Sequence, residues 1–416
     1  MKIKKIISSA LAAIMLCFAL VSCMDTENDP SAGMDLTGTY NITMWVSEKE
    51  GVAEQFQRQI DAFEAANPGI VINAEIEGVA EGDSGSRVIA DVATAPDIYC
   101  FAQDQLARLV QAAALAAPGK GAQETIKANN DAGAVASATV AGTIYAYPLT
   151  SDNGYYLYYD KSIVKNPESL EDIIADCEKN NVKFRYGLEN AWYTASFFFA
   201  TGCKSEWTMS EDGTFTAVSD NFNSPEGLIA MKGMQKLAKS PCYDSNADIF
   251  TNAGAIVTGI WNAETAESHF GENFAVTDLP SFSVDGKDYH LGSFTGNKLM
   301  GVKPQSDAKR ATVLSKLAQY LTGEECQNQR YESFQWGPSN LKAQASEAVQ
   351  SNPSLAALAK QNAYGKPQGQ IHGGWWDITR VLGAAAKSAK DDAALETALK
   401  NYQSAINGLL RSNTAS

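Results

Sequence analysis

A regular alternation of strand-like and helix-like patterns near the N-terminus is the feature that most constrains the fold. Short apolar or alternating runs indicate strands, and apolar residues three to four positions apart indicate helices. The strand-like segments are 41–46, 70–76 and 97–101, and the helix-like segments that follow them are 52–63, 85–93 and 103–115. This β-α-β-α-β-α order predicts a parallel sheet with helices on its faces.

The alternation continues through the middle of the chain, which favours a second α/β lobe. Further strand-like segments are 141–148, 183–188, 253–261 and 298–302, and further helical segments are 170–178, 225–238 and 308–321. Asp285-Gly286 predicts a tight hairpin turn, because this pair adopts positive φ at low cost. From about 351 onward the patterns are helical only, ending with 391–410. A chain of 416 residues is longer than one hydrophobic core usually supports, so two lobes are expected.

The N-terminus has the order of features expected of a secretory signal. Lysines among the first five residues precede an apolar stretch over 6–20, which is shorter than the roughly 20 residues of a membrane span. It ends at Ser22-Cys23, and a small residue followed by cysteine resembles a bacterial lipoprotein signal. We therefore expect removal of 1–22, lipidation of Cys23, and a flexible tether over 23–38. The alternative is a plain secretory signal with a chance cysteine.

These N-terminal features predict an extracytoplasmic lipoprotein anchored to a membrane, facing the periplasm or the cell surface. The formal net charge of −15 argues against nucleic acid or an anionic bilayer as the main partner. No second long apolar segment follows the signal. After loss of Cys17 and lipidation of Cys23, the remaining cysteines are Cys100, Cys177, Cys203, Cys242 and Cys326. Their wide spacing without a CxxC motif argues against a zinc site. Cys203 and Cys242 are one candidate disulfide pair among several.

Aromatic and acidic residues follow the ends of several predicted strands, which is where open parallel sheets bind ligands. Trp45 and Glu48 follow the first strand, Phe101 and Asp104 the third, and Trp261 ends the strand-like segment 253–261. Aromatic rings cover the apolar face of a sugar, and carboxylates accept hydrogen bonds from its hydroxyls. This mixture of side chains therefore predicts a carbohydrate site.

Two further aromatic clusters have the same character, Trp192-Tyr193 and Trp375-Trp376. Adjacent residues of a helix point about 100° apart. We therefore expect only one of the two tryptophans at 375 and 376 to face the core, and the other to face a groove.

Several phrases, in order, resemble one known family. They are Ile42–Val46, Ala95–Tyr99, Gly142–Leu149 and Gly259-Ile260-Trp261. Together they resemble the extracellular solute-binding proteins of ABC importers, in the sugar-binding branch typified by maltose-binding protein. The resemblance implies a two-lobed periplasmic-binding-protein fold of type II, each lobe a mostly parallel sheet flanked by helices. It implies an N-terminal lobe of 39–149 plus 297–344 and a C-terminal lobe of 150–296 plus 345–416.

The family resemblance also implies a ligand cleft between lobes that close like a hinge. The residues that it places in the cleft are Glu48, Phe101, Asp104, Asp152, Trp192, Tyr193, Trp261 and a tryptophan at 375 or 376. Asp104 and Asp152 would accept hydroxyl hydrogen bonds. Because Lys49 is the one cation near these segments, a neutral sugar or oligosaccharide is favoured over an anionic one. A monomer without cofactor or metal would deliver the sugar to the membrane subunits of an ABC permease.

Other functions remain open at this stage. A surface lipoprotein that captures glycans without transport would use the same cleft. An anchored glycosidase would need two carboxylates across the cleft, for which Asp104 and Asp152 are candidates. Gly82–Gly85 is similar to a serine-protease nucleophile loop, but no histidine lies in a matching context. Asp244–Asp248 begins like a calcium loop but lacks the expected glycine and closing glutamate, so we interpret it as an acidic turn. We therefore expect a binding protein and not an enzyme.

Overall fold

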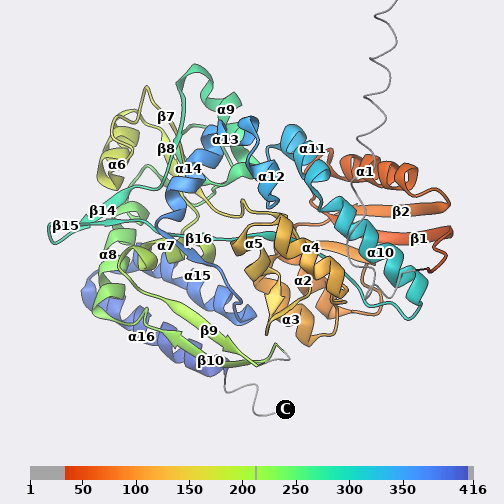
Figure 1. The fold of residues 1–416 in the computed structure, drawn as a ribbon. Coiled ribbons are helices and arrows are strands. Elements are labelled where there is room, and N and C mark those ends of the chain that lie inside the picture. Colours follow the sequence, from red (N-terminus) through yellow and green to blue (C-terminus); the bar gives the residue numbers. More distant parts are fainter. Residues whose placement is uncertain (1–32, 211–212, 411–416) are drawn as a thin grey trace, which may run out of the picture.

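The computed structural model describes residues 33–210 and 213–410 (Figure 1). The predicted signal at 1–22, Cys23 and most of the predicted tether lie outside the described residues. Two five-stranded sheets organise the described part, in the orders β2-β1-β3-β17-β6 and β11-β8-β12-β7-β13. Each sheet carries its own buried core, so the chain forms two α/β lobes.

The first sheet begins with the parallel strands that the sequence pattern predicts. β1 (Gly38–Val46) pairs in parallel with β2 (Ile70–Gly78) and β3 (Ile98–Ala102). Every second residue of β1 from Tyr40 to Val46 is buried, which is the period expected when one face of a strand meets a core. α1 (Val52–Ala66) connects β1 to β2 and buries Phe56, Ile60 and Phe63 at helical spacing.

One strand of the first sheet, β17 (Lys298–Val302), runs opposite to the others. It lies between β3 and β6 (Tyr147–Thr150) and is antiparallel to both. The sheet is therefore mixed, with β1, β2, β3 and β6 in one direction and β17 in the other. β17 follows the strands of the second sheet in the sequence, so the chain returns to the first sheet after it has formed the second.

The second sheet is mixed for a similar reason. β8 (Lys183–Arg185) is parallel to β11 (Tyr243–Asp244) and β12 (Ala253–Thr258), whereas β7 (Tyr156–Asp160) is antiparallel to β12 and β13 (Phe274–Thr277). All six residues of β12 are buried, because structure covers both faces of this central strand.

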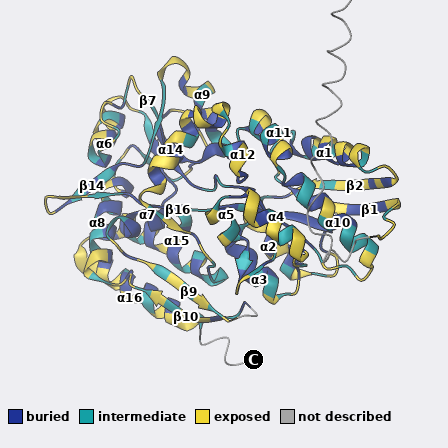
Figure 2. Cartoon of the chain, in the orientation of Figure 1, coloured by how far each residue is buried: buried dark blue, intermediate teal, exposed yellow. Residues whose placement is uncertain are grey.

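Helices surround the sheets on both sides (Figures 1 and 2). The first lobe adds α2 (Glu81–Ala90), α3 (Leu106–Gln111), α4 (Lys120–Asn129), α5 (Ala132–Ser137), α10 (Ala308–Leu321) and α11 (Glu324–Phe334). The second adds α6 (Leu170–Lys179), α7 (Ala191–Ala200), α8 (Pro225–Ala238), α9 (Ala263–Phe270), α14 (Pro353–Asn362), α15 (Gly373–Ser388) and α16 (Asp392–Leu409). The short helices α12 (Leu341–Gln344) and α13 (Glu347–Gln350) lie between α11 and α14 in the chain.

The second lobe also carries two antiparallel hairpins. β9 (Ser205–Met209) pairs with β10 (Phe215–Asp220), and β14 (Ser281–Val284) pairs with β15 (Lys287–His290). Asp285 and Gly286, the turn of the second hairpin, have φ angles of 52° and 75°. This confirms the turn predicted from Asp-Gly.

Some predicted elements differ from the structure. The helix predicted over 103–115 is a 3-10 turn over Gln103–Gln105 followed by α3, because Ala113 adopts a left-handed φ of 52°. The C-terminal part is not helical only, since β18 (Gly365–Pro367) pairs with β16 (Ser293–Thr295). The segment Gly365–Pro367 has no apolar pattern of its own, so its pairing with β16 determines its conformation.

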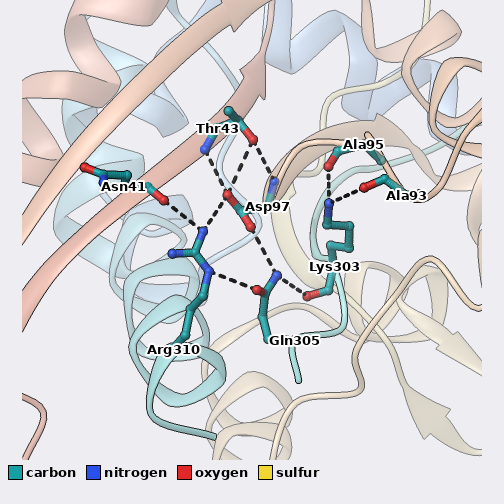
Figure 3. Close-up of polar contacts among 8 residues, drawn as sticks. All are labelled: Asn41, Thr43, Ala93, Ala95, Asp97, Lys303, Gln305 and Arg310. Carbon is teal, nitrogen blue, oxygen red and sulfur yellow. Dashed lines mark hydrogen bonds and ion pairs between the residues drawn. The ribbon is translucent and has the colours of Figure 1, made fainter. Parts of the chain in front are cut away.

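A polar clamp fixes α10 to the start of the first sheet (Figure 3). The buried carboxylate of Asp97 accepts from the backbone N–H of Thr43 at 3.0 Å and pairs with Arg310 at 2.9 Å. Gln305 donates to the same carboxylate at 3.1 Å, and Arg310 also donates to the carbonyl of Asn41 at 2.9 Å. Charge-assisted hydrogen bonds of this kind are the stronger ones, and here they join β1, the residue before β3 and the segment after β17.

The five cysteines of the described part are buried and free. The candidate pair Cys203–Cys242 is therefore not formed. Burial raises the pKa of Cys203 and Cys242, which is typical of inert structural thiols. No helix among the described residues is long and apolar enough to cross a membrane.

Three segments lead from one sheet to the other. The first joins β6 to β7, the second joins β16 to β17 through Gly296 and Asn297, and the third runs from α11 to α14. The lobe boundaries predicted from the family resemblance fall in or beside these segments. The boundaries themselves stay a prediction.

Candidate functional site

Asp104 and Trp376 come from different lobes and meet. Asp104 lies in the 3-10 turn before α3 and is 6 % exposed, and the Trp376 side chain, near the start of α15, lies close enough to act on its carboxylate. Arg108, one turn further along, also acts on the Asp104 carboxylate. Burial raises the pKa of Asp104 to about 6, although Arg108 and Trp376 oppose the shift. The sequence-predicted carboxylate and one predicted tryptophan thus form a contact between the lobes.

The two adjacent tryptophans of α15 have different environments. Trp375 is fully buried in the second-lobe core, where it makes edge contacts with Phe222 and Phe294. Trp376 is half-buried, and its ring is inclined at 84° to that of Trp375. The expectation that only one of them faces the core is confirmed, and the outward one is Trp376.

A second aromatic group joins α7 to the end of β12. The rings of Trp192 and Trp261 lie 5.8 Å apart at an angle of 35°, and Tyr155 lies 4.6 Å from Trp192. Trp192 and Trp261 are both half-buried, and the buried Nε1 of Trp192 has no hydrogen-bond partner among the described residues. Trp261 folds back over Gly259, where a Cβ atom would approach its ring to 2.1 Å, so this position requires glycine.

Asp152 lies at the crossing from β6 to β7 and is only 1 % exposed. One of its carboxylate oxygens accepts from the backbone N–H of Gly337 at 2.6 Å, and the other is buried without a partner among the described residues. Burial raises the pKa of Asp152, and the charge of Lys298 opposes that shift. Asp152 therefore joins the first and third crossing segments and leaves one oxygen unused.

Lys298 is a functional candidate that the sequence patterns do not reveal. Its ammonium lies 3.4 Å from the Glu81 carboxylate and 5.2 Å from the centre of the Trp336 ring. Burial acts to lower the pKa of Lys298, but the charges of Glu81 and Asp152 outweigh it and raise that pKa. Glu81 and Lys298 are far apart in sequence, so no local spacing marks them as a pair.

Three predicted site residues do not face a cleft in the structure. Phe101 has no exposed surface and packs in the first-lobe core beside Tyr99. Tyr193 is 6 % exposed and packs against Tyr155 and Tyr186 in the second-lobe core. Trp375 is buried as described above. Phe101 lies near the end of a strand, and Tyr193 and Trp375 lie near the start of a helix. Other parts of the chain cover these positions, so a place at the end of a strand or helix does not by itself expose a side chain.

The remaining predicted residues lie on the first lobe near the end of β1. Trp45 is half-buried, and its indole N–H donates to Glu77 of β2 at 2.9 Å. Glu48 is exposed. Lys49, which follows it, lies 5.7 Å above the Phe334 ring, and burial lowers its pKa although Glu264 of the second lobe opposes the shift. Glu264, which lies in α9 of the second lobe, is therefore near enough to Lys49 for its charge to act on that group.

Several buried polar atoms near these residues have no hydrogen-bond partner among the described residues. They belong to Glu81, Ser84, Gln105, Thr150, Asp152 and Trp192. Buried polar groups are almost always satisfied by protein, water or ligand. A ligand rich in hydroxyl groups, together with water, would supply both hydrogen-bond donors and hydrogen-bond acceptors to these atoms.

The region of the crossing segments holds a separate polar cavity of about 340 Å³. Its walls come from the crossing segments and from α5, α12 and α14: Asp131, Gly133, Ser151, Asn153, Gly154, Thr295, Gly296, Asn297, Gln344, Leu358 and Asn362. None of the sequence-predicted ligand residues lines it. In the described residues no group of three or more His, Cys, Asp or Glu side chains is placed to hold a metal ion. Asp244 instead pairs with Arg185 at 3.0 Å and accepts from the backbone of Asn246, which fits the predicted acidic turn.

The raised pKa of Asp104 predicts a measurable pH dependence of stability. An aspartate raised from 3.8 to about 6 contributes stability that is present below about pH 4 and lost as the pH rises through 6. Relative to wild type, Asp104→Asn should therefore gain up to about 3 kcal/mol of unfolding free energy between pH 4 and pH 7. Urea unfolding at both pH values measures this gain. A difference between the two proteins that does not change with pH would show that the carboxylate is not buried.

Two α/β lobes joined by crossing segments, with tryptophans and carboxylates on facing surfaces, define the class of binding proteins that hold a small solute between lobes. The family model described as bacterial extracellular solute-binding protein matches residues 58–357. The chain belongs to this family. The family consists of solute-binding proteins and not of enzymes, which agrees with the expectation from sequence. The resemblance stated from the sequence phrases is confirmed.

The matching proteins include a maltotriose-binding protein and a maltodextrin-binding protein. The chain is 22% identical over 384 residues to the maltotriose-binding protein of Pyrococcus abyssi, a match that covers 89% of this chain and 82% of that protein. Its fold superposes with a TM-score of 0.75 on the maltodextrin-binding protein MalE1 of L. casei BL23 without ligand, at 21% identity, covering 88% of this chain and 98% of that one. A structure solved with acarbose gives a TM-score of 0.76 at 26% identity, covering 91% and 100%. These matches confirm the two-lobed type II fold.

Proposed function

We propose that the protein binds a neutral α-glucan oligosaccharide between its lobes and delivers it to an ABC permease. The observation that carries the proposal is the contact of Asp104 with Trp376 across the lobes, since it places a carboxylate and an aromatic ring of opposite lobes at one point. Trp192 and Trp261 of the second lobe add a pair of neighbouring rings. The names of the relatives, which bind maltotriose or were solved with acarbose, support an α-glucan.

The charges near the site favour a neutral ligand. Lys49 is the one cation near the predicted segments in the sequence, but the structure adds Lys298 and Arg108. Lys298 is paired with Glu81, and Arg108 acts on Asp104. Because carboxylates already balance these cations, an anionic sugar would have to break an existing pair to be bound. A neutral sugar needs only hydroxyl hydrogen bonds and stacking.

A thermal-shift screen tests the proposal. Maltose, maltotriose and a uronic-acid oligosaccharide of similar length would be compared at equal concentration. Maltotriose should raise the melting temperature, because a ligand at 100 times its Kd stabilises the native state by about 2.7 kcal/mol. The uronic-acid oligosaccharide should leave it unchanged. A shift produced by the charged oligosaccharide alone would reject a neutral sugar, and release of glucose from maltotriose by the purified protein would reject a binding protein.

Lipid anchoring, monomeric state and hinge closure are parts of the same proposal. The signal-like residues at 1–22 and Cys23 support an anchor, and cell fractionation tests it by showing whether the protein separates with membranes. The bodies that would move are 39–149 plus 297–344 and 150–296 plus 345–416, with the crossing segments as the hinge. Capture of glycans at the surface without transport is the alternative, and it predicts that deleting the gene leaves maltotriose uptake unchanged.

A further inference from the structure

The loop between β18 and α15 reaches the first lobe through one side chain. The amide of Gln370 makes two hydrogen bonds with the backbone of the other lobe. Its Oε1 accepts from the N–H of Ala107 at 2.8 Å, and its Nε2 donates to the carbonyl of Gln103 at 3.1 Å. One side chain thus pairs with a donor and an acceptor of the first lobe at once, which fixes its orientation as well as its position.

The first-lobe partner of Gln370 is itself held firmly. The backbone N–H of Gln103 donates to the carbonyl of Asn297 at 3.2 Å, and its side chain accepts from the N–H of Asn297 at 2.6 Å. Asn297 belongs to the second crossing segment. Gln103 is therefore bound to the hinge on one side and to Gln370 on the other, so the contact made by Gln370 does not move independently of the hinge.

Further contacts lie along the same line, which we name the α3 seam: residues 103–111 of the first lobe against 214 and 370–376 of the second. Gln111 donates to Thr214 at 3.3 Å, next to the β9–β10 hairpin. Gly373 lies so close to Arg108 that a Cβ atom would approach its guanidinium to 2.8 Å. Trp376 lies close enough to Asp104 to act on its carboxylate. Gln370 is the member whose polar atoms bond only backbone across the seam.

We propose that Gln370 is a positioning residue that holds the lobes together before any sugar is bound, and that it thereby sets the affinity for the sugar. The affinity part rests on the proposed function, and the lobe-contact part does not. The amide already has its partners in the first-lobe backbone, so Gln370 acts without touching the ligand. If a substitution lowers the population of molecules whose lobes are held together by Gln370, the apparent Kd for the sugar rises by the factor by which that population falls.

Two substitutions and a matched control test the proposal. Gln370→Ala removes both hydrogen bonds. Gln370→Glu still accepts from Ala107 but places a negative charge against the carbonyl of Gln103. Gln403→Ala is the control, because the amide of Gln403 in α16 bonds only Asn407 of its own helix. The measurements are small-angle X-ray scattering of the ligand-free proteins, calorimetric titration with maltotriose, and thermal unfolding.

Both Gln370 variants should have a larger radius of gyration than wild type without sugar, and about tenfold weaker binding of maltotriose. They should unfold cooperatively near the wild-type temperature, and Gln403→Ala should match wild type in all measurements. Unchanged scattering in both variants would overturn the proposal, whatever happens to affinity, because Gln370 would then not hold the lobes. Expanded variants with unchanged maltotriose affinity would overturn the affinity part. If wild type binds no maltotriose, the proposed sugar is wrong, and the scattering still decides the role of Gln370.

Discussion

Replacing Trp261 with alanine should abolish the rise in melting temperature that maltotriose produces. The ring is half-buried, lies 5.8 Å from Trp192 and is held in place over Gly259. Such a ring offers a sugar a stacking surface that is already ordered, so little conformational entropy is lost on binding. We expect affinity to fall more than a hundredfold, since both the stacking surface and the support of Trp192 are lost.

The matched control is Tyr289→Ala. Tyr289 is also a half-buried aromatic residue of the second lobe, but it lies in the β14–β15 hairpin, where it stacks on Phe282. Its replacement should lower the melting temperature and keep the full shift with maltotriose. A normal maltotriose shift in Trp261→Ala would show that the ring is not part of the ligand site.

Trp375→Ala should have the largest effect on stability, and Trp376→Ala a small one. Trp375 is fully buried between Phe222 and Phe294, so truncation leaves a cavity and costs about 3–5 kcal/mol of unfolding free energy. Trp376 is half-buried and loses less packing, about 1 kcal/mol. Urea unfolding of both variants measures the difference.

The same pair should separate stability from binding. Trp376→Ala removes the ring that acts on Asp104 from the other lobe, and with it a stacking surface, so maltotriose affinity should fall at least tenfold in a folded protein. Trp375→Phe, which keeps an aromatic ring in the core, should restore most of the stability and bind maltotriose normally. Equal stability losses in the two alanine variants would contradict the assignment of the inward and outward rings.

Local patterns predicted elements whose limits are encoded locally. Helix α8 begins and ends as predicted, at Pro225 and Ala238, because Ser224 caps its first turn and proline suits the first helical position. Strand direction is different. An apolar run at 298–302 indicates a strand, but the period is the same in parallel and antiparallel strands, so the orientation of β17 could not be predicted from it.

The candidate site was predictable in kind and less so in detail. Acidic and aromatic residues at strand ends indicated a sugar site, and the 100° step of a helix predicted that Trp375 and Trp376 would differ. Phe101 was misplaced because β3 is buried on both faces, which depends on the elements packed against the sheet and not on the sequence around Phe101. Lys298 and Gln370 act through partners distant in sequence, so only the folded chain reveals them.

The position of β17 in the first sheet has a consequence for synthesis and export. β3 and β6 leave the ribosome early, but β17, the strand that joins them, ends only at Val302. Gln103 likewise forms its hydrogen bond with Asn297, which lies 194 residues later in the chain. A nascent chain that has emerged only to the end of the second sheet cannot complete its first lobe. Long-range pairing of this kind slows folding, so the chain remains unfolded long enough for a translocase to move it across the membrane.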